Sequence, residues 1–324
     1  MPPQRPQRTR QVCSPCTRLN YDSPSSLRAF LDERGLGMRK RLGQNFLINP
    51  AFRARLVEAL EISPGEDVWE IGPGLGAMTR ELLATGAVVR GFEIDPGFAA
   101  YLWEEFSGQP NFTLVRGDVL KTWQGEKAAP YLLGNLPYNI AAVLLGDLIE
   151  GERFFKRLVV TVQKEVGRRM IARPGQDDYS SFSVLITTVY KVKPLMTMGG
   201  ASFYPPPRVD SLGLRLDLRD EALSSPFPPL FYPLVRRLFS KRRKTVKNSL
   251  CSFVASYGIV KGQTPKDLTM AALENSRIRA EERPENLDVP QFRELALELQ
   301  RLGLGVCELP GGMPEEPNDR EIFA

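Results

Sequence analysis

Residues 134–139, Gly-Asn-Leu-Pro-Tyr-Asn, combine the residue types needed to orient an aromatic amine for attack on a methyl group. The exocyclic amine of adenine is a poor nucleophile, because its lone pair is delocalised into the ring. The side-chain oxygen of Asn135 and the backbone carbonyl of Leu136 could accept its two N–H bonds and aim the lone pair at a methyl donor. Pro137 fixes its own φ, and Tyr138 offers a flat ring on which an unstacked base can lie. Such a transfer depends on positioning and electrostatics rather than on a histidine base.

A glycine-rich loop at residues 72–76 precedes this segment and could hold the methyl donor against the backbone. Its glycines, Gly72, Gly74 and Gly76, leave no Cβ between the ligand and the chain. Together with Ala77 they also satisfy the fingerprint of a dinucleotide-binding loop, so a nicotinamide cofactor is a competing interpretation. Residue 73 is a proline, which favours the methyl donor because it removes a backbone N–H that a pyrophosphate would use.

Three acidic residues, Glu70, Glu93 and Asp118, lie at the ends of successive predicted strands. In a parallel sheet such ends meet at the edge where these folds bind ligands. Glu70 lies beside the glycine loop, where its charge suits the ammonium or sulfonium of S-adenosylmethionine (SAM). Glu93 could accept hydrogen bonds from both ribose hydroxyls, and Asp118 could pair with the adenine amino group. Carboxylates suit a cation and repel phosphates, so the pattern favours SAM over a nucleotide.

The composition excludes several classes of chemistry. The 324 residues contain no histidine, which removes Ser-His-Asp and Cys-His catalysis and His-ligated metals, and we expect no metal. Four cysteines do not make a disulfide scaffold and suit a reducing compartment, so we expect a cytoplasmic protein. No apolar run approaches the roughly 18 residues of a membrane-spanning helix. The net charge of +5 mildly favours a polyanionic partner.

Strand and helix patterns alternate along much of the chain and predict the sheet that positions these residues. Strands are predicted at 67–71, 87–93, 112–116, 131–134, 157–162, 189–198 and 209–217. Helices are predicted at 50–61, 77–85, 96–106, 141–149 and 164–172, and short helices at 226–302. The alternation predicts an α/β fold, a Rossmann-like SAM-dependent methyltransferase sheet with a small C-terminal helical domain.

We therefore divide the chain into four parts. Residues 1–22 are expected to be a disordered basic arm, because prolines at its start spoil the amphipathic helix of a mitochondrial presequence. Residues 23–220 are the predicted methyltransferase domain, and 221–303 a helical RNA-binding domain. Residues 304–324 are expected to be a disordered acidic tail, in which five acidic residues accompany a single arginine.

Residues 236–247 carry seven basic side chains and no acidic one. On a helix, Arg237, Lys241 and Lys244 would share one face, while Val235 and Leu238 would face inward. Such a face suits contacts with RNA phosphates that position the RNA without reading its bases. The predicted RNA-binding residues are Arg237, Lys241, Arg242, Arg243, Lys244 and Lys247.

Several separate motifs, in order, resemble those of the small-subunit ribosomal RNA adenine N6,N6-dimethyltransferases, the kasugamycin-resistance type. The resemblance covers about residues 20–300. It rests on 40–47 (KRLGQNFL), 70–76 (EIGPGLG), 135–139 (NLPYN), 163–166 (QKEV), 203–211 (FYPPPRVDS), 242–245 (RRKT) and 248–250 (NSL).

The resemblance implies particular roles for some residues. SAM would contact Asn45, Leu47, Gly72, Glu93, Asp118 and Asn135. Phe203 would hold the target adenine against Tyr138. The family adds two methyl groups to each of two adjacent adenosines in the 3′-terminal hairpin loop of small-subunit rRNA, so we expect that rRNA, or a pre-assembled small subunit, as partner. We expect a monomer.

Three other interpretations stay open. A large-subunit rRNA adenine methyltransferase of antibiotic resistance shares the fold and the NLPY-like motif, although residues 203–211 and the C-terminal helices favour the small-subunit type. A ribosome-assembly or mitochondrial transcription factor could keep SAM and act by occupancy alone, against which the intact residues 135–138 and Phe203 argue. An NAD-dependent oxidoreductase would bind NADH and not SAM.

Overall fold

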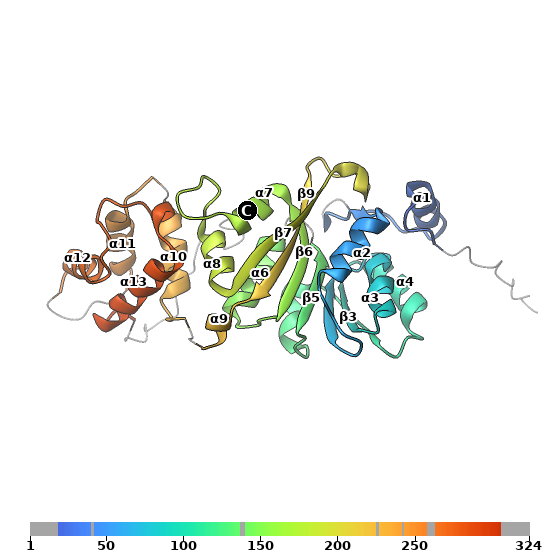
Figure 1. The fold of residues 1–324 in the computed structure, drawn as a ribbon, viewed down its shortest axis with the longest axis horizontal. Coiled ribbons are helices and arrows are strands. Elements are labelled where there is room, and N and C mark those ends of the chain that lie inside the picture. The colour runs from blue at the N-terminus through green and yellow to red at the C-terminus, as the bar shows by residue number, and fades with distance from the viewer. Residues whose placement is uncertain are drawn as a thin grey trace, which may run out of the picture.

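The computed structural model describes residues 19–39, 42–136, 140–224, 227–241, 243–257 and 263–305. Its centre is a seven-stranded sheet in the order β4-β3-β2-β5-β6-β9-β7 (Figure 1). The strands are β2 Asp67–Ile71, β3 Val88–Glu93, β4 Phe112–Arg116, β5 Tyr131–Asn135, β6 Arg157–Gln163, β7 Tyr190–Met198 and β9 Ser211–Leu218. The five strands from β4 to β6 in this order pair in parallel, whereas β9 is antiparallel to both β6 and β7. The predicted α/β sheet is therefore confirmed.

The central strands explain why the candidate residues meet. Strand β2 is paired on one side with β3 and on the other with β5. Their carboxyl ends accordingly bring Gly72, Glu93 and Asn135 to one edge of the sheet. Four of the five residues of β2 are buried, as expected for a strand that is covered on both faces.

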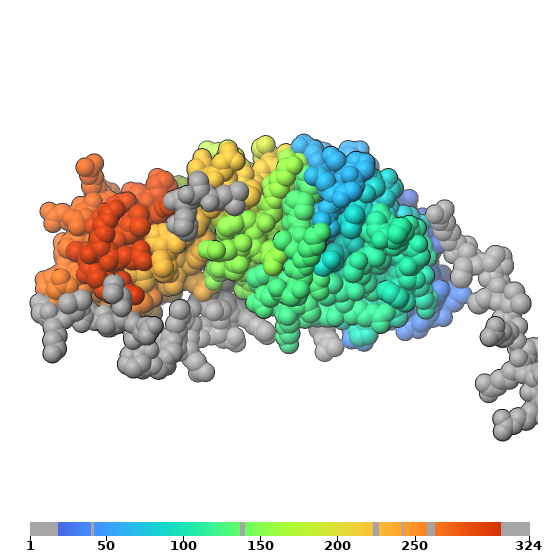
Figure 2. All heavy atoms as spheres, turned by 90° about the horizontal axis from the view of Figure 1, so that it is seen from below, coloured from blue at the N-terminus to red at the C-terminus, as the bar shows by residue number. Residues whose placement is uncertain are grey.

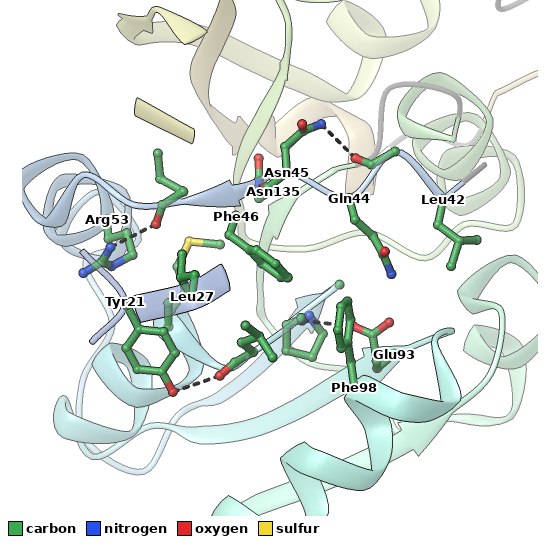
Figure 3. Close-up of a pocket in the computed structure, with 18 of the residues that line it drawn as sticks. Tyr21, Leu27, Leu42, Gln44, Asn45, Phe46, Arg53, Glu93, Phe98 and Asn135 are labelled. Carbon is green, nitrogen blue, oxygen red and sulfur yellow. Dashed lines mark hydrogen bonds between the residues drawn. The ribbon is translucent and has the colours of Figure 1, made fainter. Parts of the chain in front are cut away.

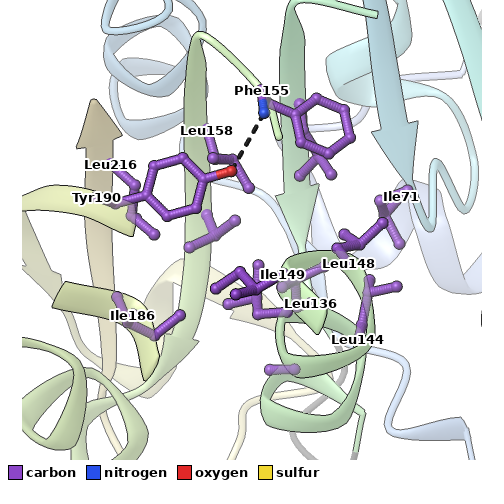
Figure 4. Close-up of a cluster of buried hydrophobic side chains, with 14 of the residues drawn as sticks. Ile71, Leu136, Leu144, Leu148, Ile149, Phe155, Leu158, Ile186, Tyr190 and Leu216 are labelled. Carbon is purple, nitrogen blue, oxygen red and sulfur yellow. Dashed lines mark hydrogen bonds between the residues drawn. The ribbon is translucent and has the colours of Figure 1, made fainter. Parts of the chain in front are cut away.

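Helices cover both faces of the sheet. Leucines of α2 and α3 pack with Val68 and Val89 on one face, and α6 and α8 pack with Trp69 and Ile71 on the other (Figure 4). The bounds are α1 Pro24–Glu33, α2 Pro50–Glu58, α3 Ala77–Ala84, α4 Pro96–Phe106, α5 Val119–Thr122, α6 Ala141–Glu150, α7 Lys164–Ile171, α8 Ser181–Val189 and α9 Asp220–Ser224. The sequence missed α8, because its run SFSVLITTV contains no charged residue and is buried at eight of nine positions, so no polar face marks a helical period.

A two-stranded ribbon lies beside the ligand edge of the sheet. It pairs β1 (Phe46–Leu47) antiparallel with β8 (Phe203–Tyr204), so two motifs far apart in the sequence become neighbours. Helix α1 packs against α4 through Leu27, Leu31 and Phe98. These elements form the wall that faces the glycine loop.

Four helices with a core of their own follow the sheet and lie at one end of the elongated molecule (Figure 2). They are α10 Phe231–Phe239, α11 Val246–Val254, α12 Pro265–Asn275 and α13 Val289–Arg301. Phe231, Leu238 and Phe292 are fully buried among them. The predicted C-terminal helices are confirmed.

Residues at the inner ends of the predicted arm and tail pack against the folded protein. Leu19 and Tyr21 are each only 8% exposed, and the Tyr21 hydroxyl donates to the Leu75 carbonyl at 2.8 Å. Leu304 is 2% exposed in the C-terminal core. Residues 1–18 and 306–324 lie outside the described part of the chain.

Candidate active site

Two adjoining cavities open at the ligand edge of the sheet. The first, of about 90 Å³, lies between the glycine loop and the β1 ribbon, and Glu93 and Asn135 reach its wall (Figure 3). The second, of about 280 Å³, lies between the end of β3, α5 and the start of α6. Leu42, Gly72 and Ile94 line both. Since ligand sites usually measure about 300–1,000 Å³, the two cavities are best understood as parts of one site.

The glycine loop uses its backbone N–H groups within the protein. Gly72 donates to the Phe92 carbonyl at 3.0 Å, Gly74 to Glu93 Oε2 at 2.9 Å, and Gly76 to the Pro73 carbonyl at 2.8 Å. Pro73 has no N–H to give. The loop therefore lacks the row of free donors that a pyrophosphate requires, which argues against a dinucleotide.

Glu93 ends β3 at the cavity wall and is 5% exposed. Its carboxylate also accepts from the Asp95 backbone N–H at 2.8 Å, which fixes its direction. Burial raises the pKa of Glu93 to about 7, against the opposing effect of these backbone donors. A fixed, partly desolvated carboxylate of this kind fits a ribose diol.

Asp118 lies on the second cavity, as predicted. It is the N-cap of α5, where one carboxylate oxygen accepts from the Leu120 N–H at 3.1 Å. Around it the wall is apolar, with Phe92, Ile94 and Val119. An apolar slot with one carboxylate fits the flat adenine ring of SAM and its amino group.

Glu70 does not reach either cavity. The side chain is fully buried, and one carboxyl oxygen accepts from the Thr79 hydroxyl at 2.6 Å. Burial is the largest cause that raises its pKa to about 8, and the charge of Glu93 raises it further. Because the carboxyl is mostly neutral at pH 7, the structure does not support its predicted pairing with the SAM sulfonium. Its hydrogen bond with Thr79 joins β2 to α3.

Asn135 is held at the cavity in one orientation. Its side-chain Nδ2 donates to the Asn45 backbone carbonyl at 2.8 Å. A carbonyl can only accept, so the amide nitrogen must face Asn45 and the oxygen Oδ1 is left as an acceptor for a ligand. This is the arrangement that an adenine amine requires.

Leu136 is fixed from both sides. Its backbone N–H donates to the Thr161 carbonyl at 3.0 Å, and its side chain is 1% exposed in the core under α6 (Figure 4). A Cβ on Gly134 would come within 2.6 Å of the Leu136 side chain, so glycine is needed for this close packing. The next two predicted residues, Pro137 and Tyr138, lie outside the described chain.

Phe203 is not on the cavity wall. It is 3% exposed and packs with Leu47, Leu56 and Met198. In this arrangement its ring is not presented to a base, so its predicted role in holding the adenine stays a prediction that requires β8 to move. Of the other predicted contacts, Asn45 and Leu47 line the first cavity, and Gly76 caps α3 without touching it.

The sequence missed the buried Arg53, which lines the first cavity at 5% exposure. Its guanidinium donates to Glu81 at 2.9 Å, to the Leu47 carbonyl at 2.9 Å and to Asp22 at 2.5 Å. Among the described residues of both cavities it is the only cation, and two carboxylates neutralise it. No free positive charge faces the site there, which again fits SAM better than a phosphate. No local sequence pattern identifies Arg53, because the carboxylates that it binds are far from it in the sequence.

The predicted basic helix is a helix end and a turn. Helix α10 ends at Phe239, the described residues Lys241, Arg243 and Lys244 are exposed on the following turn, and Lys247 lies in the first turn of α11. Arg237 does not share their face, because it donates to the Ser252 hydroxyl at 2.7 Å. Arg242 lies outside the described residues. The inward residues Val235 and Leu238 are buried, as predicted.

Two glycines of the loop allow a test that separates folding from ligand binding. Gly76 has φ +82°, and an added Cβ would meet the Phe106 ring at 2.4 Å, so Gly76→Ala should lower the free energy of unfolding by about 2–4 kcal/mol. Gly72 has φ +68° with no atom within 4 Å of that position. Gly72→Ala should therefore cost only about 1–2 kcal/mol of stability but weaken SAM binding, because its methyl would enter the cavities. Urea unfolding measures the loss of stability, and isothermal titration measures the loss of SAM affinity. If the two variants showed the same losses, Gly72 would not lie at the SAM site.

Within the described ranges, no helix is long and apolar enough to span a membrane, and no cluster of acidic and cysteine side chains is placed to hold a metal ion.

Comparison with known proteins identifies the family that the sequence matches. A model of the family described as ribosomal RNA adenine dimethylase matches residues 35–272. Ribosomal RNA small subunit methyltransferase A of Treponema denticola is 42% identical over 250 residues, which are 74% of this chain and 84% of that protein. The protein of the same name from Borreliella burgdorferi (strain ZS7) is 38% identical over 279 residues, or 86% of this chain and 94% of that protein.

Two solved structures are also similar. A dimethyladenosine transferase from Plasmodium falciparum superposes with a TM-score of 0.70 at 27% identity, covering 79% of this chain and 98% of that one. The 23S rRNA methyltransferase ErmE gives a TM-score of 0.55 at 26% identity, covering 78% and 99%. The likeness therefore extends over both the sheet and the helices that follow it.

Proposed function

The chain belongs to the ribosomal RNA adenine dimethylase family, and from this premise we propose how its residues carry out the SAM-dependent dimethylation of small-subunit rRNA. The two cavities hold SAM, with Glu93 on the ribose and Asp118 on the adenine. The target is N6 of two adjacent adenosines in the 3′-terminal hairpin loop. The relatives with 38–42% identity are named as small-subunit enzymes, which favours this target over large-subunit rRNA.

The fixed orientation of Asn135 is the observation that carries the proposal. Its Oδ1 accepts one N–H of the adenine amine, and the Leu136 carbonyl accepts the other. With both N–H bonds held, the nitrogen lone pair points at the methyl donor. SAM, when bound, supplies an electrophilic methyl group on its sulfonium. The amine then loses a proton to water, and the chain needs no histidine for that step.

Mass spectrometry tests this function directly. The purified chain is incubated with isotope-labelled SAM and either the free rRNA hairpin or a small subunit that lacks the modification. We expect a gain of two labelled methyl groups on each of two adjacent adenosines. Methylation of large-subunit rRNA instead, located by primer extension, would contradict the proposal. The two substrates also show whether free RNA suffices.

We further propose a cytoplasmic enzyme that acts as a monomer.

The basic turn after α10 provides a test of RNA binding. Replacing Arg242, Arg243 and Lys244 with glutamine should weaken binding to the hairpin and reduce the salt slope, log Kd against log salt, by about 2. Each phosphate contact that forms on binding releases about 0.7–0.9 counterions, so the loss of three contacts lowers the slope by about 2. Lys127→Gln is the control, since Lys127 pairs with Asp67 at the start of β2, on the edge of the sheet opposite the cavities. An unchanged slope in the triple variant would show that the turn is merely solvated.

A further inference from the structure

A large groove separates the sheet from the C-terminal helices on the edge opposite the SAM cavities. It has a volume of about 700 Å³, and Tyr190, Lys191 and Arg219 line one wall. Tyr190 pairs with Leu218 beside the start of β6. Asn135 is the last residue of β5, which runs parallel to β6, so the two residues lie at opposite edges of the sheet. The other walls come from the segment after α7 and from the start of α13.

The groove is basic. Its lining contains Arg173, Lys191, Arg219 and Arg293 against the acidic residues Glu221 and Asp288. Asp288 is engaged as the cap of α13, where it accepts from the Gln291 N–H at 2.9 Å. Arg173 and Lys191 are exposed, and no ion pair within the described chain involves either side chain. Both cations therefore line the groove without an ion pair among the described residues, although Lys191 lies opposite Asp217 in the pairing of β7 with β9.

The groove also has apolar walls. Tyr179, Tyr190 and Phe227 line it, and the Arg293 guanidinium lies 5.5 Å from the centre of the Phe227 ring. A matching ligand would combine carboxylates with a few apolar side chains. An all-phosphate ligand would leave these walls uncovered.

The chain itself contains a segment of this chemistry, and the last described residue before it lies near the groove. Residues 306–324, here called the acidic segment, hold five acidic residues, one arginine and the apolar pair Ile322-Phe323. The segment begins after Gly305, whose Cβ position is 3.4 Å from the Leu230 side chain, three residues beyond the groove residue Phe227. An extended chain advances about 3.3 Å per residue, so Glu308 to Glu316 can reach the groove.

We propose that the acidic segment docks in this groove, with its carboxylates beside Lys191 and Arg173. Docking joins the sheet to α13 and neutralises a basic surface that lies away from the catalytic edge. RNA phosphates are then attracted chiefly to the basic turn after α10. The inference goes beyond the methyltransferase activity and does not depend on it.

Zero-length crosslinking of the full chain tests the docking. A carbodiimide activates a carboxyl group, and a lysine amine in direct contact displaces the activating group to form an amide. In the monomeric fraction at low salt, we expect peptides that join Lys191 to Glu308, Glu315 or Glu316. The ion pair of Lys127 with Asp67, at 2.9 Å, is the internal positive control, and the exposed Lys121 is the negative control. At 1 M salt the Lys191 crosslinks should fall several-fold, since the Debye length is then about 3 Å.

A pair of variants sharpens the result. Arg173→Glu should reduce the Lys191 crosslinks at least threefold, because it places a negative charge in the groove. Arg168→Glu changes another exposed arginine, which lies in α7 and does not line the groove, and should leave the crosslinks unchanged.

Three outcomes would overturn the proposal. One is an absent Lys191 crosslink while Lys127 still joins Asp67, and another is an equal effect of the two variants. The third is protection of Lys191 by the rRNA hairpin with no crosslink to the acidic segment, which would assign the groove to RNA.

Discussion

Asn135→Ala is expected to reduce the rate of methyl transfer by roughly a thousandfold while the protein stays folded. The effect is large because the side-chain oxygen acts on the amine as it attacks, and a single fixed hydrogen-bonding group of this kind is worth about 10²–10³ in rate. The measurement is single-turnover transfer of labelled methyl groups to the rRNA hairpin at saturating SAM.

The matched control for this variant is Asn111→Ala. Asn111 also donates from Nδ2 to a backbone carbonyl, that of Ala87 at 2.7 Å, but lies away from both cavities. Both variants lose one such hydrogen bond, so their melting temperatures should fall by similar amounts. If Asn135→Ala kept more than a tenth of the activity, the side chain would not hold the attacking amine.

Glu93→Gln is expected to weaken SAM binding by about 10- to 100-fold. A hydrogen bond to a charged group contributes about 1.5–3 kcal/mol, and the substitution removes that charge from the ribose contact. Its amide group would also oppose one of the two backbone N–H groups, of Gly74 and Asp95, that now point at the carboxylate. Isothermal titration with SAM measures the change.

The pH dependence of SAM binding should follow the same residue. Because burial raises the pKa of Glu93 to about 7, its charged form is lost as the pH falls through 7. SAM affinity in the unmodified protein should thus rise between pH 6 and pH 8, whereas Glu93→Gln should show no such rise. An identical pH profile in both proteins would remove Glu93 from the binding site.

Glu70→Gln is the control for Glu93→Gln and should leave SAM affinity within about twofold. Glu70 is already mostly neutral at pH 7 and does not line the cavities. Its raised pKa also has a consequence for stability. The neutral carboxyl favours the folded state below the ordinary pKa of about 4.5, and this contribution is lost as the pH rises to about 8. Gln keeps the side chain neutral, so the stability of Glu70→Gln relative to the original should increase between pH 5 and pH 8 in thermal unfolding.

Much of the sheet was predictable because its signals are local. The runs at 67–71 and 112–116 correspond to β2 and β4 without change, since a short, largely apolar run bounded by turn residues has few alternatives to a strand. The antiparallel pairing of β9 with β6 was not predictable. It joins segments about 50 residues apart, and no local pattern records such a partner.

Burial separates the two glutamates that the sequence treated alike. Glu93 is the last residue of its strand and reaches the cavity, whereas Glu70 is one residue short of the end of β2 and turns under α3 to Thr79. Alternate residues of a strand point to opposite faces, so one position decides between ligand contact and core. Tertiary packing likewise buries Phe203, and the expected basic helix ends at Phe239.

The sequence by itself determined the reaction, because the Asn135 amide, the Leu136 carbonyl and the glycine loop are chemical groups that a short segment carries wherever it folds. Only the tertiary structure decided which of these groups face the ligand and what charge they bear. The physical reason is that desolvation and hydrogen-bond partners, such as Asn45 for Asn135, come from residues distant in the chain.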